Sequence, residues 1–284
     1  MDGEKTPAVA NVMASESIQE NPMANGAAPR VWLWLALPAC ATVLLLAVTN
    51  KICLDIAVIP FLWVLPLSLY LLSFIVSFDS PRWYRRWFWL PALVLALAAV
   101  LCIILGKNVV VPDALLLRPF RWLLRRADDL SLLKTIGIYL GTLFIGCMVC
   151  HGEVYRLRPA ASKLTGYYLA IAAGGAFGGL FVAGLAPLLF RDYFELPLGF
   201  FLVGLLAAVV LFVDQQSPLH HGRRVWAWSL IVPSLIGLGV GWYCGAIENV
   251  HLSVEVTRSF DGMLKVDEYW AGDSEAHEVR LLHG

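Results

Sequence analysis

Apolar positions along this chain fall into long runs separated by short polar connections. About 20 apolar residues in a helix cross the roughly 30 Å hydrocarbon core of a bilayer, where a helix satisfies its own backbone hydrogen bonds. The pattern therefore predicts an all-α polytopic membrane protein with about seven transmembrane helices. The predicted spans cover residues 31–49, 56–78, 88–106, 133–150, 166–190, 196–213 and 226–247.

The fifth run, residues 166–190, has no formally charged side chain and holds two glycine pairs with a spacing of four residues. Gly174 pairs with Gly178, and Gly175 pairs with Gly179. That spacing clears one helix face for close approach by another helix. A merely flexible glycine cluster is the alternative. A phosphate-binding loop is disfavoured, because such loops open a helix after a strand and this cluster lies in the middle of a span.

Three segments depart from the pattern of spans. Residues 1–30 are polar and lack periodic apolar positions, which predicts a disordered tail. Residues 114–126 mix leucine and aromatic residues with four arginines, which predicts an amphipathic segment in the membrane interface. Residues 248–284 alternate apolar and polar positions around Asp261-Gly262, which predicts a β-hairpin in water.

Composition supports the membrane assignment. The chain has 284 residues, of which 59% are hydrophobic and 15% charged, and its mean hydropathy is +0.72. The 21 basic and 21 acidic residues balance, so no basic field indicates a nucleic-acid partner. Lysine and arginine are slightly more frequent in the connections on the side of the N-terminal tail. This bias predicts a multi-pass protein with a cytoplasmic N-terminus and, after seven spans, an external hairpin.

The six cysteines lie in or at the ends of apolar segments, unlike a secreted disulfide framework. Cys147, Cys150 and His151 have the spacing of a c-type haem attachment motif. However, the cysteines occupy the last turn of an apolar span, and no second axial ligand is evident. We therefore expect packed cysteines, no cofactor and no metal.

Polar residues at two membrane boundaries are the candidate site. His151, Glu153, Arg156 and Arg158 follow the fourth span, where they can bind an anion or transfer a proton. Glu153 and Arg156, three residues apart, can equally form a structural ion pair. Asp55 lies between the first two spans, one turn after Lys51. If it is buried, Lys51 is its expected partner, and in the headgroup region it needs none.

Three motifs carry a resemblance to a known family: DIAVIPFLWVLPLSLY at residues 55–70, CHGE with RLRP between 150 and 159, and AGGAFGGLF at 173–181. With them, residues 31–284 resemble the bacterial fused major-facilitator/spermidine synthase proteins. In that family a multispan membrane portion precedes a synthase-like domain with a small β-structured part and a Rossmann-like part. The resemblance implies that residues 248–284 begin the β-structured part. No glycine-rich nucleotide loop or acidic aminopropyl-transfer site is present, so no catalytic residue is carried over.

Two functions follow as hypotheses. The first is a multi-pass inner-membrane protein that forms the membrane portion of a spermidine synthase-like fusion and is not catalytically competent alone. Its expected partners are the lipid bilayer and a separate or missing synthase-like domain. The alternative is a small-solute carrier for polyamines or their precursors, with Asp55, Glu153 and His151 as its embedded polar groups.

Overall fold

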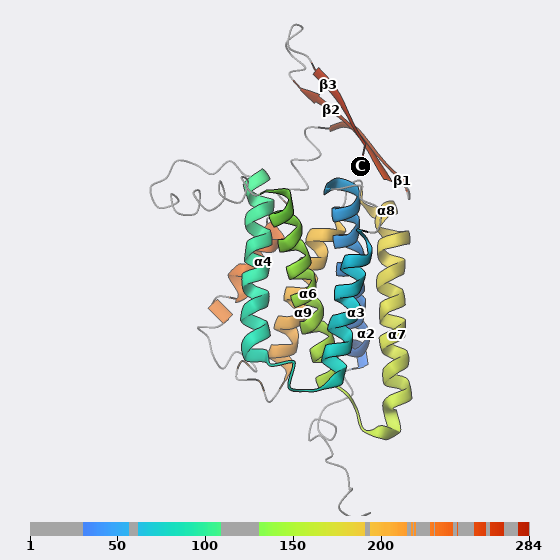
Figure 1. Ribbon diagram of the computed structural model, residues 1–284, viewed down its shortest axis with the longest axis vertical. Helices are drawn as coiled ribbons and strands as arrows, with labels where there is room; N and C mark the ends of the chain where they lie inside the picture. Colours follow the sequence, from blue (N-terminus) through green and yellow to red (C-terminus); the bar gives the residue numbers. More distant parts are fainter. Residues whose placement is uncertain are drawn as a thin grey trace, which may run out of the picture.

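A computed structural model describes a bundle of helices followed by three strands (Figure 1). The residues described are 31–56, 62–108, 131–190, 194–214, 217, 219, 228–229, 231–240, 243, 253–259, 262–269 and 278–283. The predicted tail, residues 1–30, and the predicted interfacial segment, residues 114–126, lie outside them.

The helices follow the apolar runs. They are α2 (Val31–Asn50), the π-helix η2 (Lys51–Ile56), α3 (Val64–Asp79), α4 (Arg86–Asn108), α6 (Leu132–Arg156), the 3₁₀ turn η4 (Ala161–Lys163), α7 (Leu164–Leu180), the π-helix η5 (Phe181–Leu185), α8 (Ala186–Leu189) and α9 (Glu195–Val213). Residues 231–240 form a further helix.

Five helical stretches are long and apolar enough to cross a membrane, which agrees with the prediction of a helical membrane protein. They are Val31–Cys53, Arg86–Ile104, Leu132–Arg156, Ala161–Leu189 and Glu195–Val213. The helices in the second and seventh predicted spans are shorter. The helix in the second predicted span is α3, which has 16 residues and is therefore about 24 Å long at 1.5 Å per residue. It begins at Val64 rather than 56, and Pro66 falls in its first turn, where proline costs no helical hydrogen bond.

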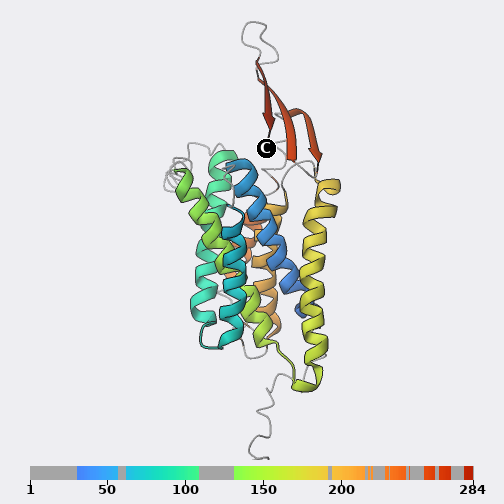
Figure 2. The same cartoon turned by 45° about the vertical axis from the view of Figure 1, so that its right-hand side comes forward.

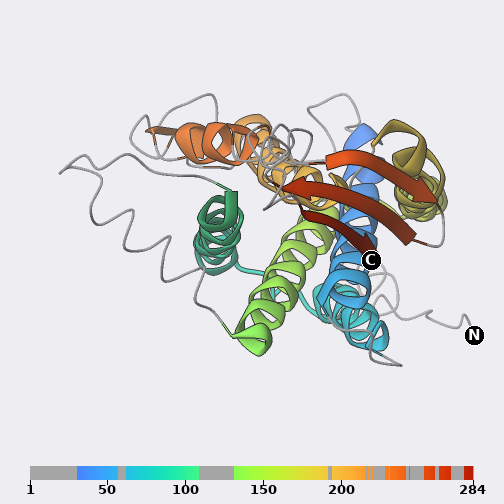
Figure 3. The same ribbon diagram turned by 90° about the horizontal axis from the view of Figure 1, so that it is seen from above.

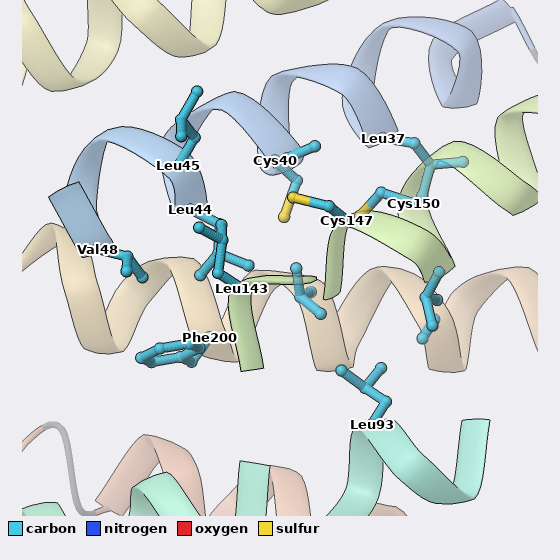
Figure 4. Packing of buried hydrophobic residues seen from close by; sticks show 14 of the residues in the cluster. Leu37, Cys40, Leu44, Leu45, Val48, Leu93, Leu143, Cys147, Cys150 and Phe200 are labelled. Carbon is cyan, nitrogen blue, oxygen red and sulfur yellow. The ribbon is translucent and has the colours of Figure 1, made fainter. Parts of the chain in front are cut away.

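The centre of the bundle is α2, which packs against α3, α6, α7 and α9 (Figure 2). Its side chains Leu44 and Val48 are buried in one cluster with Leu143 of α6 and Phe200 of α9, and Leu37 is buried near Cys150 of α6 (Figure 4). Helices in lipid have no hydrophobic driving force toward one another, so such interdigitated packing supplies the attraction between them. Three free cysteines lie in this core and are fully buried there: Cys40, Cys147 and Cys150.

The closest helix pair is α2 with α7, and glycine makes it possible. A Cβ atom on Gly174 would lie 2.3 Å from the carbonyl oxygen of Leu35, and one on Gly178 would lie 2.4 Å from that of Ala39. Because the obstacles are backbone atoms, no rotamer change can make room. The two backbones of α2 and α7 therefore touch directly through these two glycines.

Three strands follow the helices: β1 (Ser253–Ser259), β2 (Gly262–Tyr269) and β3 (Glu278–His283). They form one antiparallel sheet in the order β1-β2-β3, in which Ser259 pairs with Gly262 and Tyr269 with Glu278. Figure 3 shows the sheet from above. The third strand was not expected from the sequence. Asp261 of the predicted turn lies outside the described residues, so the turn itself stays a prediction.

Candidate functional site

Charged side chains from three helices meet where α4 begins and where α6 and α9 end. Arg86, the first residue of α4, donates from Nε to Oε1 and from Nη2 to Oε2 of Glu153, both at 2.6 Å. Its Nη1 donates to Oδ2 of Asp214, the residue after α9. The side chains of Glu153 and Asp214 are each 2% exposed. We call Tyr84, Arg86, Glu153, Arg156 and Asp214 the boundary cluster.

Arg156 completes the charge balance of the boundary cluster without close hydrogen bonds. Its Nε lies 3.8 Å from Oε2 of Glu153, and its Nη2 lies 3.7 Å from Oδ2 of Asp214. Among the described residues, its Nε has no hydrogen-bond partner, although that atom is buried. The side chain as a whole is 35% exposed. Two arginines therefore neutralise two carboxylates, and Arg156 is the looser and more accessible of the pair.

Tyr84, in the connection between α3 and α4, covers the cluster. Its hydroxyl donates to Oε1 of Glu153 at 2.7 Å. Burial raises the pKa of the Tyr84 phenol well above its usual value, and the neighbouring Glu153 carboxylate raises it further. Tyr84 therefore stays a neutral hydrogen-bond donor. Its ring lies on Gly152, where a Cβ atom would approach ring atoms to between 2.2 and 2.7 Å.

Replacing Gly152 by alanine is expected to displace the Tyr84 ring and to destabilise the protein by about 1–3 kcal/mol, the usual cost of overpacking. Tyr84→Phe keeps the ring and removes only the hydroxyl, so it should cost about 1 kcal/mol. Unfolding in detergent, followed by circular dichroism, measures both. A Gly152→Ala protein as stable as wild type would mean that the ring does not depend on this glycine.

His151 lies one residue before Gly152 and points toward α3 rather than into the boundary cluster. Its Nδ1 is 3.0 Å from Oγ of Ser73, and that hydroxyl donates to the carbonyl oxygen of Tyr70 at 2.7 Å. Ser73 thus accepts from Nδ1–H, which leaves the lone pair on Nε2. In the described part of the chain, Nε2 has no hydrogen-bond partner, and the residue is 1% exposed. The rings of Tyr70 and Phe74 enclose it edge-on.

The other predicted site residues lie apart. The guanidinium of Arg158 sits over the Tyr155 ring, 4.9 Å from its centroid. Trp34 donates to the carbonyl oxygen of Leu157 at 3.0 Å, which places the start of α2 beside the end of α6. Lys51 follows the last residue of α2, about 25 Å further along that helix at 1.5 Å per residue. The side chain of Asp55 lies outside the described residues. The two predicted polar groups therefore do not form one site.

Arg86, Asp214 and Tyr84 were missed as site residues. In the sequence, Arg86 counts only among the basic residues of the connections, and Asp214, one residue after the predicted span 196–213, was not singled out. The usable signal is that an ionisable residue directly beside an apolar span is costly without a partner. Two such residues of opposite sign, at the ends of two spans on the same side, are candidates for pairing.

No group of three or more histidine, cysteine or acidic residues is arranged to hold a metal ion within the described ranges. Cys147 and Cys150 point into the packed core toward Cys40 of α2 (Figure 4). Comparison of the chain with protein-family models, with curated proteins and with solved structures found no match.

Proposed function

We propose that this chain is the membrane portion of a spermidine synthase-like protein, which anchors a synthase-like domain and performs no aminopropyl transfer alone. The observation that carries the anchoring role is the boundary cluster. The carboxylates of Glu153 and Asp214 are buried and held by Arg86, so they are occupied in joining three helices. A carrier for cationic amines needs carboxylates that its substrate can reach.

The proposed topology has seven passes and an external β-structured extension. Both α2 and α4 begin at the boundary marked by Trp34 and Arg86, so the chain between them returns through α3. In the same way α9 ends at this boundary, and the helix at 231–240 leads away from it. The proposal puts this boundary on the cytoplasmic side, and the excess of arginine and lysine in its connections supports that orientation by the positive-inside rule.

The strands β1 to β3 support the second half of the proposal. A sheet of three strands is at the lower limit of independent stability and gains from packing against further structure. In the family that this chain resembles, the β-structured part is the N-terminal part of the synthase-like domain. We accordingly propose that β1 to β3 pack on such a domain, whether it is fused to this chain or encoded separately.

The test isolates the protein from its native membrane with an antibody against residues 1–30. The proposal expects either an intact mass larger than 31.3 kDa by a whole domain, or a stoichiometric partner, and aminopropyl transfer by the isolated material. A protein of 31.3 kDa that is isolated alone and without transfer activity overturns the proposal.

A carrier is the second candidate. The observation that favours it is the buried Nε2 of His151, which has no hydrogen-bond partner among the residues that the structure describes. Uptake of radiolabelled putrescine and spermidine into proteoliposomes that contain the chain distinguishes an anchor from a carrier. An anchor should give no uptake above empty liposomes. A carrier should give uptake that Asp55→Asn and His151→Gln abolish, while Arg85→Gln, an exposed neighbour of the boundary cluster, leaves it unchanged.

A further inference from the structure

A cavity of about 500 Å³ lies between α4, α9 and the helix at 231–240. Figure 3 shows these three helices on the side of the bundle away from α7. Apart from Ser234, every side chain that lines it is apolar. On α9 it is lined by Gly204, Ala207, Ala208 and Leu211. The small side chains of Ala207 and Ala208 leave the space, whereas Leu97 and Leu235 pack closely on Gly204. The lining residue Leu95 is 72% exposed, so the cavity opens sideways toward the lipid.

The cavity has the depth of one lipid leaflet. Along α4 its lining runs from Leu90 to Leu101, about 16 Å at 1.5 Å per residue. Half of the roughly 30 Å hydrocarbon core is about 15 Å. Leu90 comes one helical turn after Arg86, so the cavity begins just inside the boundary cluster and ends near the bilayer centre.

The end of the cavity beside the boundary cluster can receive an anionic group. Leu211 lines the cavity three residues before Asp214, against which Arg156 lies at 3.7 Å. Arg156 is the partly exposed member of the cluster, since its side chain is 35% exposed while those of Glu153 and Asp214 are 2% exposed. Arginine binds phosphate oxygens through charge-assisted hydrogen bonds from its guanidinium.

We propose that this cavity binds one acyl chain of a phospholipid from the cytoplasmic leaflet, with the lipid phosphate at Arg156. The chain fills the space between α4, α9 and the helix at 231–240, and it replaces the dispersion contacts that the small α9 residues do not make. This site does not depend on the proposed anchoring function, because a carrier or an anchor can hold the same lipid.

The test purifies the protein in detergent, washes it extensively, and measures retained phospholipid by phosphorus assay and native mass spectrometry. Wild type should keep about one phospholipid per chain, since lipid held in a fitted cavity leaves more slowly than the surrounding lipid. Ala208→Trp fills the cavity and should lower retention about tenfold, which corresponds to about 1.4 kcal/mol. Arg156→Gln should lower retention of phospholipid less.

The matched control is Leu188→Trp, which adds a tryptophan on α8 at a residue that is 83% exposed and does not line the cavity. It should retain lipid as wild type does. Wild type that keeps no phospholipid, that keeps a free fatty acid instead, or that is unaffected by a folded Ala208→Trp protein overturns the proposal.

A measurement on wild type alone covers the case in which Ala208→Trp fails to fold. Vesicles of phosphatidylcholine with a small share of phosphatidylglycerol, the latter carrying a photoreactive diazirine on its acyl chain, are irradiated with the protein. Peptides from residues 90–101 and 204–211 should be labelled more densely than peptides from 164–189. Equal labelling of all three would show only general lipid contact and would refute the site.

Discussion

Gly178→Leu is expected to force α2 and α7 apart and to give one of the two largest losses of stability that the structure predicts. A Cβ atom there would lie 2.4 Å from the carbonyl oxygen of Ala39, and the obstacle is backbone. The helices can accommodate leucine only by separating, which removes the dispersion contacts that hold them together in lipid. We expect a loss of about 3 kcal/mol, the upper end for overpacking.

Gly179→Leu is the matched control, because it makes the same substitution one residue later in the same helix. A Cβ atom on Gly179 would meet nothing within 4 Å among the described residues, so leucine there should point outward without cost. Thermal unfolding of the two detergent-solubilised variants measures the difference. Equal loss in both would mean that glycine acts through helix flexibility, and that α2 and α7 do not touch through Gly178.

These glycines show which part of the helix packing could be predicted from the sequence. Spacing identified two overlapping pairs, but Gly174/Gly178 and Gly175/Gly179 have the same spacing, so no local pattern distinguishes the pair that faces α2. A Cβ atom on Gly175 would lie 3.6 Å from Oγ1 of Thr42, an ordinary contact, and one on Gly179 would meet none of the described residues within 4 Å. Which pair meets the neighbouring helix depends on how α7 is rotated against α2, a tertiary property.

Length and hydropathy were sufficient for the five long helices, because a run of apolar residues is a local signal. For the boundary cluster, local sequence could mark single residues beside apolar spans but could not identify their partners. Arg86 and Glu153 are 67 residues apart, and Arg86 and Asp214 are 128 residues apart. The sequence offered Arg156 as the partner of Glu153 because three residues is the spacing of helical neighbours. The structure gives the short hydrogen bonds to Arg86 and leaves Arg156 at 3.8 Å.

Arg86→Gln is expected to destabilise the protein by about 3–5 kcal/mol, the range found when one partner of a buried ion pair is removed. Glu153 would lose two charge-assisted hydrogen bonds of 2.6 Å and Asp214 would lose one. Arg156, at 3.7 and 3.8 Å, is too distant to replace them without moving. Glu153→Gln should destabilise by a similar amount, because it leaves Arg86 with Asp214 alone.

The double variant Arg86→Gln, Glu153→Gln distinguishes a lost pair from two separate losses. It removes one charge of each sign, so Arg156 and Asp214 remain as a balanced pair. If the interaction is direct, the double variant should be more stable than the sum of the single losses predicts, by about 1–3 kcal/mol. Arg85→Gln changes an exposed arginine beside Arg86 and should stay within about 0.5 kcal/mol of wild type. Strict additivity in this cycle would show that Arg86 and Glu153 act independently, and the three helix ends would then be held by packing instead of charge.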